Sequence, residues 1–146
     1  MGLKKIIISL FAGVFMAYPI WANEAFELRE ERMTILGKEA KSMAAMVKGR
    51  TEFAAGDFLY GALTMHNAMD GMLELFPPGS HGGDSAAKAK IWDNWEDFTA
   101  KTTASLDAIA VLAIAADGGD NQSIKQAFGK VGKTCSSCHR TYRYRR

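Results

Sequence analysis

The chain is poor in three residue types, since its 146 residues include only two cysteines, three histidines and three prolines. Two cysteines exclude the multi-disulfide framework of small secreted scaffolds. No stretch alternates apolar and polar residues between turn dipeptides, so the sequence argues against a sheet protein. The remaining composition, 48% hydrophobic, is ample for a core, and the length suits one domain.

The first 22 residues have the order of a secretory signal peptide. A basic start (MGLKK) precedes an apolar run (IIISLFAGVFMAY) and a short end (PIWA). The apolar run is shorter than the roughly 20 residues that span a bilayer, and Pro19 interrupts its end, so an uncleaved anchor is the weaker alternative. We expect cleavage after Ala22, export to the periplasm, and a single mature domain over residues 23–146 without stable membrane insertion.

The charge of the mature chain is close to balanced. Removal of residues 1–22 takes away Lys4 and Lys5, which leaves 16 basic and 16 acidic residues. Such a chain has no net field that attracts nucleic acid or a membrane surface strongly. The one basic cluster is the C-terminal tail, with Arg140, Arg143, Arg145 and Arg146. These cations suit the solvent-exposed end of a helix at least as well as they suit a docking patch.

The mature region predicts four amphipathic helices with short connections. Their ranges are 24–47, 52–75, 87–116, and a last one that starts at Asp120, Asn121 or Ser123 and runs through the cysteines. Gly49, Pro77-Pro78 and Gly118-Gly119 separate them, because glycine and proline end helices. Residues 77–86 are a loop by composition. Four such helices most simply form an antiparallel up-down-up-down bundle.

Each predicted helix carries an apolar stripe at steps of three and four residues. Methionines recur on these stripes at Met43, Met46, Met69 and Met72, and we interpret them as core filler rather than cofactor contacts. The stripe positions are Met33, Leu36, Ala40, Met43 and Met46; Leu59, Ala62, Leu63, His66, Met69, Leu73 and Phe76; Ile91, Trp95, Phe98, Thr102, Leu106, Ile109 and Ala113; and Ile124, Phe128 and Val131.

The two cysteines and a histidine form one motif, Cys135-x-x-Cys138-His139. A disulfide or a thiol redox pair is conceivable, but a thioredoxin-like pair follows a strand, and no strand is visible. A zinc site needs further ligands, and only His66 and His81 remain. The pattern fits covalent haem attachment: two thiols almost one turn apart reach one edge of a haem, and the next residue offers its imidazole to the iron. Export agrees, because this attachment happens outside the cytoplasm.

The motif lies near the C-terminus, on the last of four predicted helices. In this the chain resembles the class II c-type cytochromes, a group that comprises cytochrome c prime and its low-spin, methionine-ligated relatives. The resemblance spans the mature chain and implies an all-α four-helix bundle with one covalently bound haem c near the C-terminus. The matching stretches are Arg29-x-x-x-Met33-x-x-x-Gly37, Leu75-Phe76-Pro77-Pro78-Gly79-Ser80, Lys90-Ile91-Trp92 and Cys135-x-x-Cys138-His139-x-x-Tyr142-Arg143.

By the resemblance, the side chain on the distal side of the haem decides the function. In the family the first helix crosses there, and the decisive position is Met33. With His139 and Met33 as axial ligands the iron is low-spin and the protein is an electron-transfer carrier. If the register slips by one turn, Leu36 takes this place, and a five-coordinate, high-spin haem binds nitric oxide or carbon monoxide. Periodicity alone makes Met33 an ordinary buried residue.

Two arginines are candidates for contacts with the haem propionates. Arg29 precedes Met33 by one turn and Arg143 follows His139 by one turn, with a solvated surface arginine as the alternative for each. His66 is interpreted as a hydrogen-bonded residue in the core or at its boundary on the second helix, and His81 as a solvated loop residue, neither of them as a ligand. The other aromatic residues of note, Trp92, Trp95, Phe98 and Tyr142, are expected to pack the bundle, and Phe128, Val131 and Thr134 to line the haem site.

The expected partners are redox proteins of the periplasm, which bind weakly and transiently because electron exchange requires turnover. We expect no nucleic-acid partner. Proteins of the resembled family often dimerise through their first two helices, and the sequence leaves a homodimer open. We expect no enzymatic activity and no catalytic residue, because peroxide cleavage needs a distal acid–base group and no histidine lies near Met33.

Overall fold

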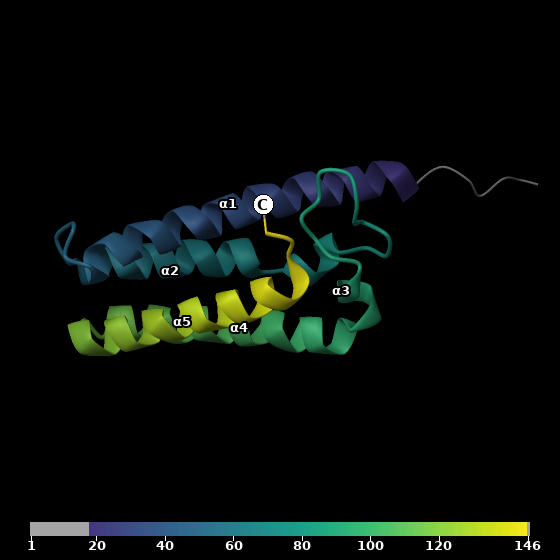
Figure 1. The fold of residues 1–146 in the computed structure, drawn as a ribbon. Helices are drawn as coiled ribbons and strands as arrows, with labels where there is room; N and C mark the ends of the chain where they lie inside the picture. The colour runs from purple at the N-terminus through teal and green to yellow at the C-terminus, as the bar shows by residue number, and fades with distance from the viewer. Residues whose placement is uncertain (1–17, 146) are drawn as a thin grey trace, which may run out of the picture.

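The computed structural model describes the backbone of residues 18–145 and the side chains from residue 23 onward. Four long helices form two antiparallel pairs, α1 with α2 and α4 with α5 (Figure 1). This confirms the predicted all-α four-helix bundle. The predicted signal peptide, residues 1–22, lies largely outside the described residues. The elements are α1 Tyr18–Val47, α2 Ala55–Met69, the 3₁₀ helix η1 Met72–Leu75, α3 Lys90–Asp93, α4 Trp95–Asp117 and α5 Asn121–Tyr142.

The bundle is held mainly by α2 and α4. Helix α2 packs against both α1 and α4, and α4 packs against α5, whereas α1 and α5 hardly approach each other. The α1–α2 contact is close at Gly61, where an added Cβ would lie 3.4 Å from Met43 Cε. Buried side chains from all four helices, among them Met43, Phe58, Ile109 and Ile124, fill the core. The separation of α1 from α5 leaves room between them for the site described below.

The second predicted helix is shorter than the sequence indicated. Helix α2 ends at Met69, and Gly71 adopts a left-handed conformation (φ 63°) before η1 begins. Glycine reaches this region without steric cost, so the turn at Gly71 breaks the predicted range 52–75. On α2 itself Leu63 is 51% exposed, so this position of the predicted stripe does not belong to the core.

The third predicted helix, 87–116, is two helices. The one-turn helix α3 ends at Asp93, and Asn94 leaves helical geometry (φ −132°, ψ 49°) before α4 begins at Trp95. The kink turns Trp95 outward, to 40% exposure, although Ile91 and Phe98 on either side are buried as predicted. The apolar period runs straight through Asn94, which is why the stripe did not reveal the break.

Hydrogen bonds fix both ends of α5, the helix that carries the cysteines, and its N-terminal end is one of the predicted ones. Asp120 is the N-cap of α5, and its carboxylate accepts a hydrogen bond from the Ser123 backbone at 2.8 Å. At the C-terminal end, Tyr144 donates its backbone N–H to Ala86 (2.8 Å), and Lys88 donates to the Tyr142 carbonyl (2.9 Å). The segment after α5 is therefore tied to the loop between η1 and α3.

Among the residues the structure describes, α4 is the one helix long and apolar enough to cross a membrane, judged by length and composition only. It lies between α2 and α5 in the bundle. Its buried positions, such as Phe98, Ile109 and Leu112, belong to the common core. A core helix of a globular bundle has the same length and composition.

Candidate haem site

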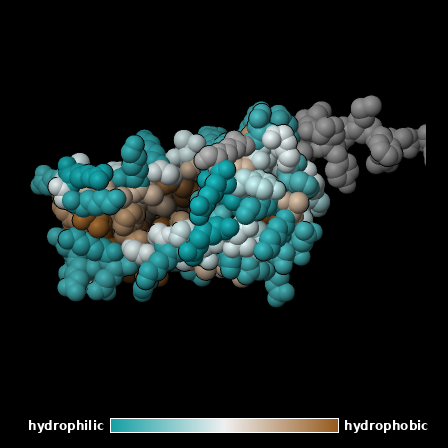
Figure 2. Space-filling model, viewed as in Figure 1, coloured by the Kyte–Doolittle hydropathy of each residue, from teal (hydrophilic) through white to brown (hydrophobic). Residues whose placement is uncertain are grey.

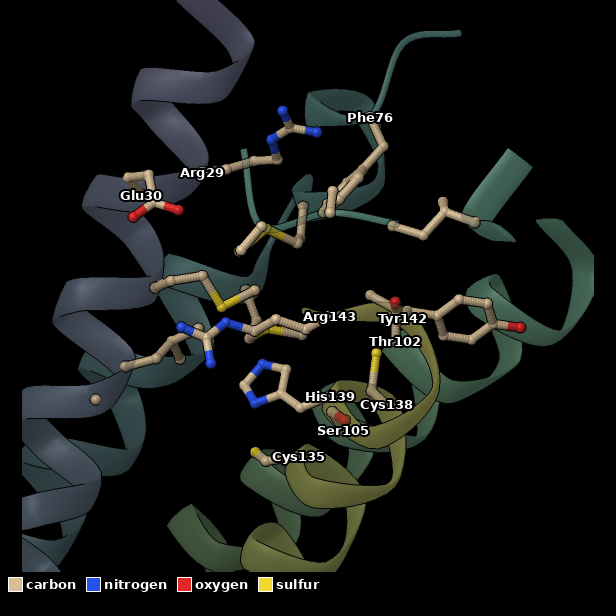
Figure 3. Close-up of a pocket in the computed structure, with 18 of the residues that line it drawn as sticks. Arg29, Glu30, Phe76, Thr102, Ser105, Cys135, Cys138, His139, Tyr142 and Arg143 are labelled. Atoms are coloured by element: carbon tan, nitrogen blue, oxygen red, sulfur yellow. The ribbon is translucent and has the colours of Figure 1, made fainter. Parts of the chain in front are cut away.

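A cavity of about 430 Å³ lies between α1 and α5. In Figure 2 the apolar residues of the viewed face gather in the hollow between these two helices. In Figure 3 the labelled side chains of the cavity wall come from α1 on one side, such as Arg29, and from α5 on the other, such as His139. Its principal lining residues are Arg29, Met33, Leu36, Gly37, Ala40, Met65, Met69, Met72, Phe76, Ile91, Phe98, Cys135, Cys138, His139, Tyr142 and Arg143.

One wall of the cavity is formed by the motif on α5. Cys135, Cys138 and His139 all line the cavity, and the imidazole projects into it beside the two thiols (Figure 3). Burial raises the pKa of both thiols, that of Cys138 to about 11. Burial and the nearby Arg143 lower the pKa of His139, which favours the neutral imidazole. A neutral imidazole has the free lone pair that a metal ligand needs.

The α1 wall of the cavity contains both candidates for the distal position. Met33 and Leu36 are half-buried and line the cavity together with Gly37 and Ala40. These four residues offer a thioether and hydrocarbon, while Arg29, Glu30 and Thr34 are the polar residues of the same wall. The structure thus brings Met33 and Leu36 to the same cavity as His139. Which of them faces the iron stays a prediction.

The methionines of the core contribute more to this cavity than predicted. Met69 and Met72, interpreted from the sequence as core filler, are buried in the core and also line the cavity, as does Met65. Met43 and Met46 are core residues only. Met69 precedes the break at Gly71 and Met72 follows it, so both sides of this turn contribute a thioether to the cavity.

Arg29 is a buried cation at the edge of the cavity. Only 4% of its surface is exposed, and its guanidinium donates to Ser80 Oγ (3.1 Å) and to the Ser80 carbonyl (2.8 Å). The same group lies 4.6 Å from the centroid of the Phe76 ring. Desolvation lowers its pKa, and Glu30 opposes this effect weakly. No described carboxylate forms an ion pair with it, so the cavity contains a buried positive charge that lacks a counter-anion.

The remaining sequence candidates divide into those inside and those outside the site. Arg143 lines the cavity and is exposed. His66 and His81 are not among the lining residues, and the His81 ring lies 4.9 Å from the Trp92 ring in the loop region. Phe98 and Tyr142 both pack the bundle and line the cavity.

The prediction that Phe128, Val131 and Thr134 line the site is wrong. None of these three residues is part of the cavity wall. Val131 is buried in the core, and the Phe128 ring meets the Phe58 ring edge to face at 5.9 Å. Only the last two turns of α5 reach the cavity, because the first turns pack against the opposite part of the bundle.

Several lining residues had no signal in the sequence. Glu30 and Thr34 on α1, Ser85–Ala87 in the loop, and Thr102 and Ser105 on α4 all reach the cavity. Ser80, the partner of Arg29, is 51 positions away along the chain, so only the fold reveals the pair. Spacing rules find residues that share an element, and these residues come from three separate segments: α1, the loop between η1 and α3, and α4.

The residues present fit a covalently bound haem. The apolar wall matches a flat hydrocarbon macrocycle, the two thiols match its two vinyl groups, and the imidazole of His139 matches the iron. The unpaired charge of Arg29 matches a propionate carboxylate. Within the described part of the chain, no group of three or more histidine, cysteine or carboxylate side chains forms a metal-binding cluster, so a zinc site on these cysteines has no further ligands.

Comparisons with known proteins agree with this chemistry. The family model described as Cytochrome C' matches residues 24–143. Cytochrome c-556 of Agrobacterium fabrum is 33% identical over 147 residues, covering 100% of this chain and 99% of that protein. Cytochrome c' of Alcaligenes xylosoxydans xylosoxydans is 31% identical over 121 residues, covering 83% of this chain and 94% of the relative.

Solved structures show the same similarity. Cytochrome c prime from Shewanella frigidimarina superposes with a TM-score of 0.82 at 37% identity, covering 85% of this chain and 97% of that one. The nitric oxide complex of a variant of cytochrome c prime from Alcaligenes xylosoxidans superposes with a TM-score of 0.79 at 30% identity, covering 86% and 97%. The chain therefore belongs to the cytochrome c' family, and it binds one covalently attached haem c.

Proposed function

We propose that this chain is an exported mono-haem cytochrome that carries electrons, with His139 and Met33 as the two axial ligands. Cys135 and Cys138 would form the thioethers. The haem supplies a one-electron couple between ferric and ferrous iron. The observation that carries the proposal is that a methionine, Met33, lines the same cavity as His139 from the α1 wall. A thioether and an imidazole together favour a low-spin iron with a raised potential.

The protein contributes rigidity and charge to this function. His139 lies on the last full turn of α5, which is fixed to α4 and to the loop on either side of Tyr142. The apolar residues that α1 and η1 contribute to the cavity wall would reduce the water around a bound haem, which limits reorganisation when the charge of the site changes. Arg29 would neutralise one propionate and bind it to the Ser80 loop.

A second candidate is a five-coordinate haem that binds nitric oxide or carbon monoxide. The comparisons favour this candidate, because the matched family is cytochrome c' and solved relatives include nitric oxide complexes. No comparison shows methionine ligation. Leu36 lines the cavity beside Met33, so a small shift of α1 would present hydrocarbon to the iron instead of sulfur. Only the identity of residue 33 favours the first candidate.

Export, partners and assembly remain part of the proposal. Cleavage near Ala22 would deliver the protein to the periplasm, where soluble redox proteins would exchange electrons with it. A homodimer stays an open prediction, because the structure describes a single chain.

Absorption spectra of the holoprotein, oxidised and reduced, with and without carbon monoxide, test the two candidates. Met33→Leu removes the sulfur and keeps the volume nearly constant. Met69→Leu is the matched control, since it removes a sulfur from another methionine of the same cavity. The first candidate predicts low-spin bands that ignore carbon monoxide in the wild type and in Met69→Leu, and high-spin bands that respond to it in Met33→Leu. High-spin, carbon monoxide-sensitive bands in the wild type would remove Met33 from the iron and establish the second candidate.

A further inference from the structure

The charges of the mature chain are strongly separated along the sequence although their sum is zero. All 16 acidic residues lie between Glu24 and Asp120, together with nine basic residues. Residues 121–146 contain seven basic residues and no acidic one. The first part therefore has a formal charge of −7 and the last part +7. The positive part is α5 and the segment that follows it, so the charge separation in the sequence is also a separation in space.

The cations of α5 lie on its solvent-exposed side. Lys125, Lys130, Lys133 and Arg140 are all exposed, and at 100° per residue they share one arc of the helix. We call this surface the α5 basic face. It extends about 22 Å at 1.5 Å per residue, which is the width of a small protein–protein contact. In the described structure the one ion pair is Lys101–Asp97, so none of these four cations is paired with a carboxylate.

The residues between these cations are small. Gly129, Gly132 and Ser136 lie on the same exposed arc, and nothing stands within 4 Å of a Cβ placed on either glycine. Figure 2 shows hydrophilic residues along α5 separated by residues of neutral hydropathy. A partner can therefore approach the backbone of this helix closely. The opposite side of the same helix carries Cys135 and Cys138, so one helix thickness separates the α5 basic face from the attachment point of the haem.

We propose that the α5 basic face is the docking surface for a soluble redox protein with an acidic surface around its own cofactor. The inference rests on the proposed electron-transfer function. Because the total charge is near zero, the net charge does not attract such a partner, and orientation comes from the charge separation. At physiological salt the field extends about 8 Å, so the face acts at close range and favours rapid, reversible contact.

The residues of the α5 basic face suit a protein partner better than a membrane surface. A surface-bound amphipathic helix inserts leucine, phenylalanine or tryptophan into the lipid. The exposed arc of α5 offers only glycine, serine, glutamine and cations. The apolar side of the helix is committed to the core through Ile124, Ala127 and Val131. An acidic protein surface needs nothing more than the cations and the close approach that this face provides.

Small inorganic oxidants test where electrons leave the protein. In each reaction one electron passes from the reduced holoprotein to the reagent, and no proton or bond is transferred. Anionic ferricyanide is reduced to ferrocyanide, and cationic tris(phenanthroline)cobalt(III) to its cobalt(II) form. Stopped-flow rates are measured from low to high ionic strength. If electrons leave through the α5 basic face, ferricyanide reacts fast and slows with salt, whereas the cobalt reagent accelerates with salt.

Two double variants make the test specific, since both change the net charge by the same amount. Lys130→Glu with Lys133→Glu reverses the α5 basic face, and Lys38→Glu with Lys41→Glu reverses exposed charges on α1. We expect the first pair to slow ferricyanide about tenfold at low salt and the second pair less than about twofold. Equal effects of the two pairs would overturn the proposal, because then only the net charge matters.

A binding measurement completes the test without electron transfer. The probes are a plant-type ferredoxin, as an acidic redox protein, and vesicles of phosphatidylglycerol. We expect the wild type to bind ferredoxin at low salt and not the vesicles, and the α5 double variant to bind neither. Binding to vesicles alone would overturn the proposal in favour of a membrane surface. Failure of both oxidants to react with a correctly loaded protein would contradict the proposed function, while the ferredoxin measurement would still decide the docking surface.

Discussion

The Tyr142 hydroxyl donates a hydrogen bond to the Asp97 carboxylate, with 2.5 Å between the oxygens. This contact joins the end of α5 to the first turn of α4, and the Tyr142 ring also packs edge to face on Phe98 at 5.3 Å. Tyr142 follows His139 by three residues, so the contact holds the turn of α5 that carries the imidazole. The stability of the site is therefore coupled to the protonation of this pair.

Tyr142→Phe should change the alkaline stability of the protein. Burial and the hydrogen bond to Asp97 raise the pKa of Tyr142 to about 12. The folded state holds this proton more tightly than the unfolded chain does. The hydroxyl of Tyr142 therefore contributes fully to the free energy of unfolding below about pH 10, and this contribution is lost as the pH rises toward 12. Thermal midpoints of the holoprotein at increasing pH should fall steeply in the wild type and less steeply in the variant. Tyr144→Phe, at an exposed position, is the control and should keep the wild-type slope.

Arg29→Met should destabilise the protein at neutral pH. The substitution keeps the length of the side chain but removes both hydrogen bonds to Ser80, and hydrogen bonds to a charged group are worth about 2 kcal/mol each. We expect the free energy of unfolding in denaturant to fall by about 2 kcal/mol, less than the sum of the two bonds, because the variant no longer buries a charge. The reduction potential should also shift, because a propionate loses its cation. Arg50→Met, at an exposed arginine, should change the free energy by less than about 0.5 kcal/mol. Equal effects of the two variants would contradict the role of Arg29.

Phe58→Ala should be among the most destabilising substitutions in α2. The ring is 0% exposed, stacks on Phe53 at 4.8 Å between centroids, and meets Phe128 at 5.9 Å. Removing it leaves a cavity in the core and should cost about 3–5 kcal/mol in the free energy of unfolding. Tyr60→Ala, two residues away and 70% exposed, should cost less than about 0.5 kcal/mol in the same denaturant titration. A small effect at Phe58 would mean that the neighbouring rings collapse into the space.

Asp120→Ala should weaken the start of α5. The Asp120 carboxylate accepts the Ser123 backbone N–H, and this hydrogen bond lowers the pKa of Asp120. A lowered pKa means that the ionised carboxylate stabilises the fold above about pH 4 and that the contribution disappears as the pH falls further. The thermal midpoint of Asp120→Ala should lie below that of the wild type at pH 7 and approach it in acid. Asp120→Asn retains a capping oxygen and should stay close to the wild type.

The fold was largely readable from the sequence because its main breakers are strong. Gly49, the Pro77-Pro78 pair and the Gly118-Gly119 pair end helices in the structure as they do in the sequence. The missed breaks at Gly71 and Asn94 are different. Each interrupts a helix for one or two residues and then lets the apolar period continue, so a pattern averaged over several turns does not register them.

The site was readable only where its residues are neighbours in sequence. Cys135, Cys138 and His139 form a local motif whose spacing follows from helix geometry. The pairing of Arg29 with Ser80 is a long-range contact that neither residue type indicates alone. Expecting Phe128 and Val131 in the cavity failed because helix periodicity gives the angle of a side chain but not how far along α5 the cavity extends.

The loop between η1 and α3 has a consequence for how the cavity is held together. It is bonded to α1 through Ser80 and to the end of α5 through Ala86 and Lys88, and it bridges two walls that otherwise hardly touch. Arg29 and His139 lie near opposite ends of the chain, so bringing them to one cavity requires contacts of high sequence separation. The loop therefore completes the cavity only when α1 and the end of α5 are both in place, and a change that releases Ser80 or Ala86 should loosen both walls at once.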